Sequence, residues 1–303
     1  MSFREEERKK AIKIREELLR DPGGGYFLGK KREFVLKDST LNLWAGIRED
    51  VIDYFERNKI TWWMEDASNE PSGHLLSSQV ACLNHLYFIR QRQDAATAIL
   101  KNILPNITKA QIVDDGFVEF EIIGSQNYLG ERSHTRGANS TSVDALMVGE
   151  RTDGNNILFL IEWKYTEEYR ADPKYIPERY DIYNKLLDEK NCPIVINNYE
   201  ALYYEPFYQL MRQILLGWKM VENNEYSCNE FLHIHVIPEN NKELREKVTS
   251  PSLVGNTMSD AWKNVLKEPN RYIVISPDQI VKPIENCSDT KSILSYLQKR
   301  YWS

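Results

Sequence analysis

Long apolar runs are absent from this sequence of 303 residues. A membrane-spanning helix needs roughly 20 consecutive apolar residues, and no stretch of the sequence approaches that length. The first ten residues carry charges of both signs and lack the apolar segment of a signal peptide. We therefore expect a cytoplasmic protein that has no membrane partner.

Cysteine is scarce as well, since the sequence holds only four. Cys82, Cys192, Cys228 and Cys287 lie far apart and form no Cys-x-x-Cys pair. This pattern argues against a structural zinc site or a disulfide framework and favours a reducing compartment. The sequence also lacks repeats, low-complexity tracts and linkers rich in glycine, serine or proline. We therefore predict a single domain over residues 1–303.

The sequence also lacks a net positive charge. The chain has 39 Lys and Arg against 45 Asp and Glu, which gives a formal charge of −6 at pH 7. Because phosphate binding relies on Lys and Arg, this balance counts against a large non-specific nucleic-acid surface. It leaves room for a local basic cleft, and enzymes that bind divalent metals carry acidic clusters that lower the total.

The composition is that of an ordinary globular protein, since 42% of the residues are hydrophobic and 28% are charged. Helical periodicity predicts helices over residues 4–20, 39–58 and 78–102, the last with Ser77 as its N-cap. The glycines at 23–25 end the first helix. Because no Gly-Lys-Ser/Thr follows them, we interpret them as a break in the chain and not as a phosphate loop.

Strand-like segments follow from residue 112 onward. Alternating apolar and polar residues over 117–123 place Glu119 and Glu121 on one face. Residues 157–161 are all apolar, as expected for a central strand covered on both faces. Strands separated by helices predict an α/β fold, with a mixed β-sheet core flanked by helices. The predicted strands cover 112–113, 117–123, 142–148, 157–164, 231–237 and 272–275, with a long helix over 203–221.

Three charged residues carry the candidate chemistry. Residues i and i+2 of a strand share a face, so Glu162 and Lys164 point the same way while Trp163 points opposite. Asp144 lies on the preceding strand, also among apolar residues. Burying such charges costs several kcal/mol each unless they are paired or bound to an ion. Mg²⁺ favours sites with one or two carboxylates, waters and a substrate phosphate. The alternative is an ordinary Glu–Lys ion pair at a strand end, with Asp144 capping a turn.

The motif Asp144…Glu162-Trp163-Lys164, after a long helix in an α/β sheet, resembles the PD-(D/E)XK superfamily of restriction-endonuclease-like nucleases. The resemblance implies that Asp144 and Glu162 bind Mg²⁺ (or Mn²⁺), with the backbone carbonyl of Trp163 as a further ligand. Lys164 would orient the attacking water or stabilise the pentacovalent phosphate. The implied reaction is hydrolysis of phosphodiester bonds in DNA or, as a second choice, RNA.

The resemblance extends beyond the motif. Segments 77–79 and 136–145 are similar to bacterial members of the superfamily whose activity is uncharacterised. The matching region covers residues 75–238, which we predict to be a nuclease-like core. It would lie between an N-terminal helical layer over 1–74 and a C-terminal addition of helix and strand over 239–303.

One part of the superfamily's pattern is missing. Many members carry a Glu in the first core helix near the metal, whereas residues 78–93 contain neither Asp nor Glu. Gln79 is the best polar candidate there. Glu119, Glu121 and Glu131 are the alternatives for a third carboxylate, and Glu131 opens the loop just before the first acidic strand residue.

Further candidates lie on the long helix and in basic segments. Gln209, Arg212 and Gln213 fall on one helical stripe, and superfamily members often point polar residues from this helix toward the site. Arg212 would then contact the scissile phosphate, the alternative being a solvated helix face. The candidate contacts to the DNA backbone are Arg132 and Arg136, with Lys30, Lys31 and Arg32, each of which is otherwise a surface charge.

Two other features receive a structural interpretation. His233 and His235 share a strand face at a spacing suited to a metal, but no third ligand is evident. Trp62 and Trp63 are expected in the core and not stacked on nucleic-acid bases.

Two rival functions stay open. One is a catalytically inactive nucleic-acid-binding or scaffold protein that retains the fold. The other is a different enzyme, in which Glu162 and Lys164 form a structural ion pair and the chemistry lies elsewhere. A homodimer is also open, because many nucleases of this type act as dimers to cut two strands.

Overall fold

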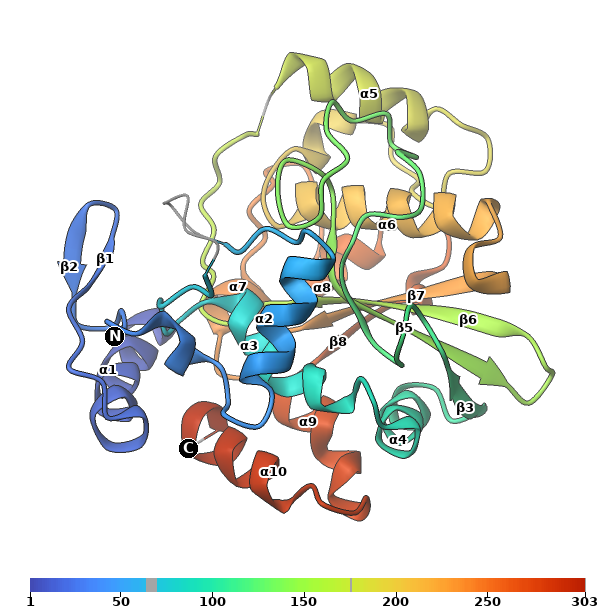
Figure 1. Ribbon diagram of the computed structural model, residues 1–303. Coiled ribbons are helices and arrows are strands. Elements are labelled where there is room, and N and C mark those ends of the chain that lie inside the picture. Colours follow the sequence, from blue (N-terminus) through green and yellow to red (C-terminus); the bar gives the residue numbers. More distant parts are fainter. Residues whose placement is uncertain (64–69, 175, 303) are drawn as a thin grey trace.

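A computed structural model describes residues 1–63, 70–174 and 176–302. A mixed six-stranded sheet with helices on both faces forms its centre (Figure 1). The strand order is β3-β5-β6-β7-β8. Both β3 and β4 pair with the same side of β5, β4 with its first half and β3 with its second half. The predicted α/β fold with a mixed sheet core flanked by helices is confirmed. The strands are β3 Ile107–Gln111, β4 Glu119–Ile122, β5 Val143–Arg151, β6 Asn156–Trp163, β7 Cys228–Val236 and β8 Tyr272–Ile275.

The directions of the strands bring the two predicted acidic positions together. β5 and β6 are antiparallel neighbours, whereas β6, β7 and β8 run parallel. Residues 157–163 of β6 are all buried, as its apolar run predicted for a strand covered on both faces. Because β5 begins where β6 ends, Asp144 and Glu162 lie at the same edge of the sheet.

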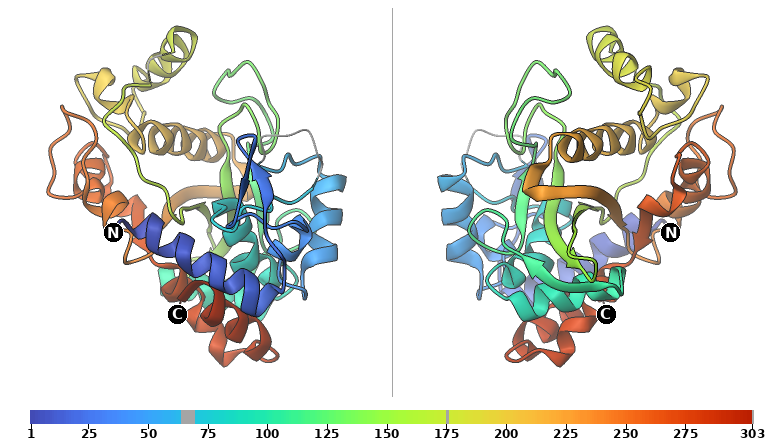
Figure 2. Two further views of the ribbon diagram at one scale, coloured as in Figure 1. Left: turned by 90° about the vertical axis from the view of Figure 1, so that its left-hand side faces the viewer. Right: turned by 90° about the vertical axis from the view of Figure 1, so that its right-hand side faces the viewer.

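One face of the sheet is covered by helices from both ends of the chain. The first and last helices, α1 and α10, contribute to the same apolar core as β6, and the views in Figure 2 place the two ends of the chain close together. The predicted N- and C-terminal helical additions are thus confirmed. The helices of this layer are α1 Phe3–Ile14, α2 Arg48–Arg57, α3 Ser78–Leu86, α4 Gln93–Ile103, α9 Pro277–Val281 and α10 Lys291–Leu297.

The other face is covered mainly by α6, Phe207–Glu222. Gly217 allows a close approach of this helix to the sheet, because a Cβ at that position would lie 2.4 Å from Leu160 Cδ1. The close packing fixes the polar stripe of α6 against the end of β6. The remaining helices on this side are α5 Pro177–Leu187, α7 Lys242–Glu246 and α8 Met258–Lys263.

Two predicted helices are interrupted. The prediction of a single helix over 39–58 is wrong. Asp38 caps a short 3-10 helix over Ser39–Asn42, and α2 begins only at Arg48. The prediction of a single helix over 78–102 is also wrong, because the segment forms α3 and α4, although Ser77 does cap the start of α3. The break coincides with Arg90, whose backbone carbonyl accepts the N–H of Phe117 at 2.7 Å and whose buried guanidinium binds the Val118 carbonyl.

The first strand is displaced from its predicted place. Ile112 and Val113 lie outside β3, which ends at Gln111, and Ile112 is exposed. A small antiparallel hairpin, β1 Gly25–Phe27 and β2 Lys30–Arg32, begins at the last glycine of the run that the sequence predicts to be a plain break. In the described part of the chain, none of the helices combines the length and apolarity needed to cross a membrane.

Candidate active site

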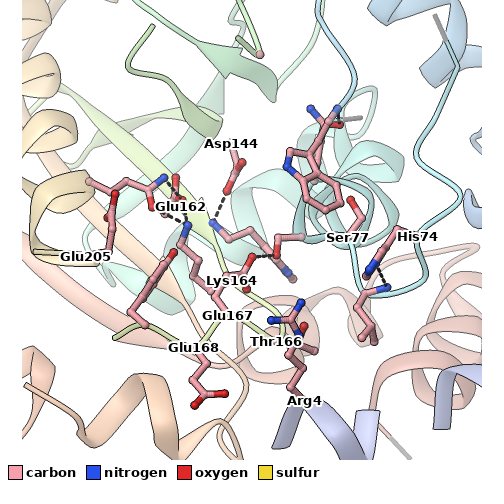
Figure 3. Close-up of a pocket in the computed structure, with 18 of the residues that line it drawn as sticks. Arg4, His74, Ser77, Asp144, Glu162, Lys164, Thr166, Glu167, Glu168 and Glu205 are labelled. Atoms are coloured by element: carbon pink, nitrogen blue, oxygen red, sulfur yellow. Dashed lines mark hydrogen bonds and ion pairs between the residues drawn. The ribbon is translucent and has the colours of Figure 1, made fainter. Parts of the chain in front are cut away.

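A cavity of about 470 Å³ opens at the sheet edge where β5 begins and β6 ends. Asp144, Glu162 and Lys164 all line it, and Figure 3 shows them around one space. Residues from β4, the start of α3 and the start of α6 also line the cavity. The structure therefore brings the three residues of the motif into one site.

Glu162 and Lys164 form a buried ion pair. Lys164 Nζ lies 2.6 Å from Glu162 Oε1, and the two residues are 2% (Glu162) and 7% (Lys164) exposed. Trp163 points to the opposite face, where its ring lies 4.6 Å from that of His85. Burial disfavours the charge on Lys164, but Glu162 and the neighbouring acidic groups outweigh that effect and raise the pKa of the ammonium well above its usual value.

The polar stripe of α6 holds this pair in place. Gln209 donates to Glu162 Oε1 at 2.7 Å and accepts from Lys164 Nζ at 2.7 Å. Gln213 donates to the other oxygen of Glu162 and accepts from His233 Nε2 at 3.1 Å. Burial lowers the pKa of His233 to about 3, so its ring is neutral and supports Gln213.

Asp144 faces the cavity from the start of β5. Its Oδ2 accepts the backbone N–H of Trp163 at 2.6 Å, while the next N–H, that of Lys164, points to β7. Since the N–H and C=O of one strand residue point the same way, the Trp163 carbonyl also lies on the Asp144 side. Burial, followed by the charges of Glu162 and Glu121, raises the pKa of Asp144 well above its usual value.

Glu121 supplies a third carboxylate to the same cavity. Its neighbours pair with Ala145 and Val143, which places Glu121 opposite Asp144. Gln79 Nε2 donates to its Oε1 at 2.7 Å. Burial, and to a smaller degree the charge of Glu162, raises the pKa of Glu121 to about 7.

The prediction that Glu119 and Glu121 share a face is wrong. Glu121 has a φ of 52°, a left-handed backbone conformation that is unusual outside glycine and interrupts strand alternation. Glu119 accordingly faces a different cavity, where it accepts from Tyr226 Oη at 2.6 Å. Among the three alternatives for a third carboxylate, only Glu121 lines the candidate site.

Glu121→Gln is expected to stabilise the metal-free protein at pH 8 and to have little effect near pH 4. The pKa of Glu121 lies above that of an unfolded glutamate, so its contribution to stability is present at acid pH and is lost as the pH rises through about 7. Thermal unfolding in EDTA measures this, and we expect a Tm gain of roughly 2–4 °C at pH 8. An equal gain at both pH values would contradict a titration effect.

Of the other predicted site residues, some line the cavity and others do not. Glu131 does not line the cavity, because it accepts from Thr141 Oγ1 at 2.5 Å and from the Tyr183 hydroxyl. Arg212 does line it, with Nη1 3.3 Å from Thr141 Oγ1. Arg132 lies outside the cavity lining.

The predicted DNA contact at Arg136 does not fit the structure. Its side chain is directed inward, with Nη2 3.3 Å from Glu119 Oε1 and Nε donating to the Glu121 carbonyl at 3.2 Å. The guanidinium therefore fixes β4 and is not available to a phosphate. The expectation for the tryptophans is half right, because Trp62 is buried and stacks on Phe55, whereas Trp63 is 49% exposed and lines the cavity.

Sequence reasoning missed several residues of the cavity wall. Glu167 and Glu168 follow Lys164 closely in the chain, and this proximity to the motif is a signal that could have found them. Arg4 and Glu205 reach the cavity from distant segments, which no local pattern indicates. Glu205 Oε2 is buried without a hydrogen-bond partner among the described residues.

Comparison with known families agrees with this architecture. Residues 9–302 match the family model REase-ARP, described as restriction endonuclease associating with ARP. The chain belongs to this family. No curated protein and no solved structure matches the REase-ARP chain. Its family name points to the nuclease class and to a nucleic-acid partner, in line with the restriction-endonuclease-like core.

The donor set of the REase-ARP site fits a hard divalent cation. Asp144, Glu162 and Glu121 offer carboxylate oxygens, and the raised pKa values of Asp144 and Glu121 reflect burial and mutual repulsion that a cation would relieve. In the described part of the chain, no three His, Cys, Asp or Glu side chains form a ready-made metal cluster. Mg²⁺ needs only one or two carboxylates beside waters and phosphate oxygens. An ion would compete with Lys164 and Gln209 for Glu162 Oε1.

Proposed function

We propose that this REase-ARP protein is a Mg²⁺- or Mn²⁺-dependent nuclease that hydrolyses phosphodiester bonds in DNA. Asp144 and Glu162 hold the cation, with the Trp163 carbonyl as a further ligand. The observation that carries the proposal is the convergence of Asp144, Glu162 and Lys164 in one cavity at the sheet edge. Membership of a restriction-endonuclease family supports it independently.

When bound, the cation lowers the pKa of a coordinated water and stabilises the charge on the phosphoryl oxygens. The chain's own residues position the rest. Lys164 stays protonated, so its ammonium offers positive charge to the pentacovalent phosphate or orients the attacking water. Gln209 aligns that ammonium, and Gln213 holds the carboxylate of Glu162 in one orientation.

Two further groups complete the proposed machinery. Glu121 adds a third carboxylate from β4, held by Gln79 of α3, so the helix that lacks a Glu still contributes to the acidic set. Arg212 lines the same cavity from α6, and its Nε is buried without a hydrogen-bond partner among the described residues. Such a guanidinium is suited to a phosphate oxygen.

The experiment that tests this function is a cleavage assay on supercoiled plasmid, linear duplex and single-stranded DNA. Each substrate is incubated with the protein in Mg²⁺, in Mn²⁺ and in EDTA. We expect cleavage in either metal and none in EDTA. A protein that binds these DNAs but cleaves none of them in either metal would be the inactive binding or scaffold protein that is the rival.

A further inference from the structure

The β1–β2 hairpin projects from the described part of the chain. Figure 1 shows it as a ribbon that stands away from the rest of the molecule. Its outward side chains include Tyr26 and Leu28, which are 69% and 60% exposed, and Lys30 and Lys31 are exposed too. Large apolar side chains held in water on a projecting ribbon indicate a contact surface.

The pairing of the two strands gives the hairpin two distinct faces. Residues directly opposite each other in an antiparallel pair share a face. Phe27 pairs with Lys30, and Tyr26 pairs with Lys31. Phe27 packs against Trp63, with ring centroids 5.8 Å apart, and Trp63 lines the candidate active site. Lys30 therefore lies on the face that turns toward the active-site cavity.

The base of the hairpin is tied to that cavity. Gly25 N–H donates to the Val35 carbonyl at 3.1 Å, and Val35 forms a β-bridge with His74. His74 and the N-cap Ser77 both line the cavity (Figure 3), and α3 begins directly after them. The same short segment thus positions the hairpin and the start of the helix that carries Gln79.

Several basic side chains without an ion-pair partner lie on the hairpin and beside it. Lys30, Lys31, Arg4 and Arg8 have no ion-pair partner among the described residues, although the chain as a whole carries a charge of −6. Arg4 lines the cavity, and the guanidinium of Arg8 lies over the Phe34 ring, 4.9 Å from its centre. Phosphates are the complement of such cations.

We propose that the β1–β2 hairpin is an arm that grips duplex DNA beside the active site. A two-stranded β-ribbon fits the major groove, which is about 12 Å wide. Lys30 contacts phosphates on the cavity side and Lys31 those on the outer side, while Tyr26 and Leu28 contact the groove. The inference rests on the proposed function, because it takes the DNA in the cavity as the occupant.

The test measures DNA binding without cleavage. An Asp144→Asn background is titrated by fluorescence anisotropy against a fluorescein-labelled duplex of about 20 base pairs and against its single strand, at about 50–200 mM KCl. Lys30→Ala/Lys31→Ala is compared with Lys101→Ala/Lys109→Ala, which removes two exposed lysines from α4 and β3 on another part of the surface. Matched melting curves confirm that each variant is folded.

The expected result is a loss of duplex affinity of about tenfold for the hairpin variant at about 100 mM salt. The slope of log affinity against log salt should fall by about 2, one for each lost phosphate contact, and the control should change neither quantity. The loss for the single strand should be smaller. Tyr26→Ala should weaken duplex binding without changing the salt slope.

Each contrary outcome has a separate meaning. Unchanged duplex affinity and slope in the hairpin variant would overturn the arm and leave the proposed nuclease intact. An equal loss for duplex and single strand would overturn the assignment to a groove of the duplex. If the background protein binds neither DNA at low salt and the wild-type protein neither binds nor cleaves them in Mg²⁺, the proposed function fails, and the arm fails with it.

Discussion

Asp144→Asn is expected to abolish DNA cleavage and, at the same time, to raise the stability of the metal-free protein. The cleavage rate should fall about 10³-fold or more, because the substitution removes a proposed metal ligand. The stability gain follows from the pKa of Asp144, which burial and the charges of Glu162 and Glu121 raise well above its usual value. The contribution of such a carboxyl to stability is present at acid pH and is lost as the pH rises through its folded-state pKa.

At pH 8 the carboxyl of Asp144 therefore costs stability, which an asparagine of the same shape recovers. The amide oxygen of the introduced side chain can still accept the backbone N–H of Trp163. Chemical denaturation in EDTA at pH 8 should show a gain of about 1 kcal/mol. Asp53→Asn is the matched control, since Asp53 is exposed on α2 and the same chemical change should alter neither activity nor stability. Cleavage by Asp144→Asn at the wild-type rate would contradict the site.

Lys164→Met is expected to destabilise the protein by about 3–5 kcal/mol, because it leaves the buried carboxylate of Glu162 without its cation. Adding Glu162→Gln should restore much of that loss, since the remaining charge is removed as well. The four proteins of the double-mutant cycle should give a coupling energy of about 2 kcal/mol or more by urea denaturation. Both variants that lack Lys164 should be inactive.

The exposed pair of Lys13 and Glu17, whose closest atoms are 3.9 Å apart, is the matched control for this cycle. Its side chains are 72% and 67% exposed, so solvent screens the interaction and the coupling should be at most about 0.5 kcal/mol. Additive effects at Glu162 and Lys164 would mean that the ammonium does not balance the carboxylate. The buried charge network would then be misassigned.

The centre of the site could be predicted because it depends on strand geometry alone. Alternation along β6 places Glu162 and Lys164 on one side and Trp163 on the other, and antiparallel pairing brings Asp144 to the same edge. Glu121 could be named only as one of three candidates. Its left-handed backbone interrupts the alternation that the pattern predicts, and nothing local in the sequence signals that conformation.

The parts that sequence reasoning missed are set by contacts between distant segments. The break between α3 and α4 coincides with Arg90, whose backbone carbonyl accepts the N–H of the distant Phe117. The hairpin begins at the end of a glycine run, a pattern that is typical of an irregular break in the chain. Its strands are too short for a clear alternation of apolar and polar residues. Trp63 lies at the cavity wall, where it stays half exposed, whereas its neighbour Trp62 enters the core.

The measurement that tests the central claim most directly is isothermal titration of Mg²⁺ and Mn²⁺ into the wild-type protein and Asp144→Asn, followed by a duplex cleavage assay on the same samples. We expect that the wild type binds metal and cleaves DNA and that the variant loses both together. A wild-type protein that binds neither metal, even with DNA present, would contradict the nuclease and leave the fold as a scaffold.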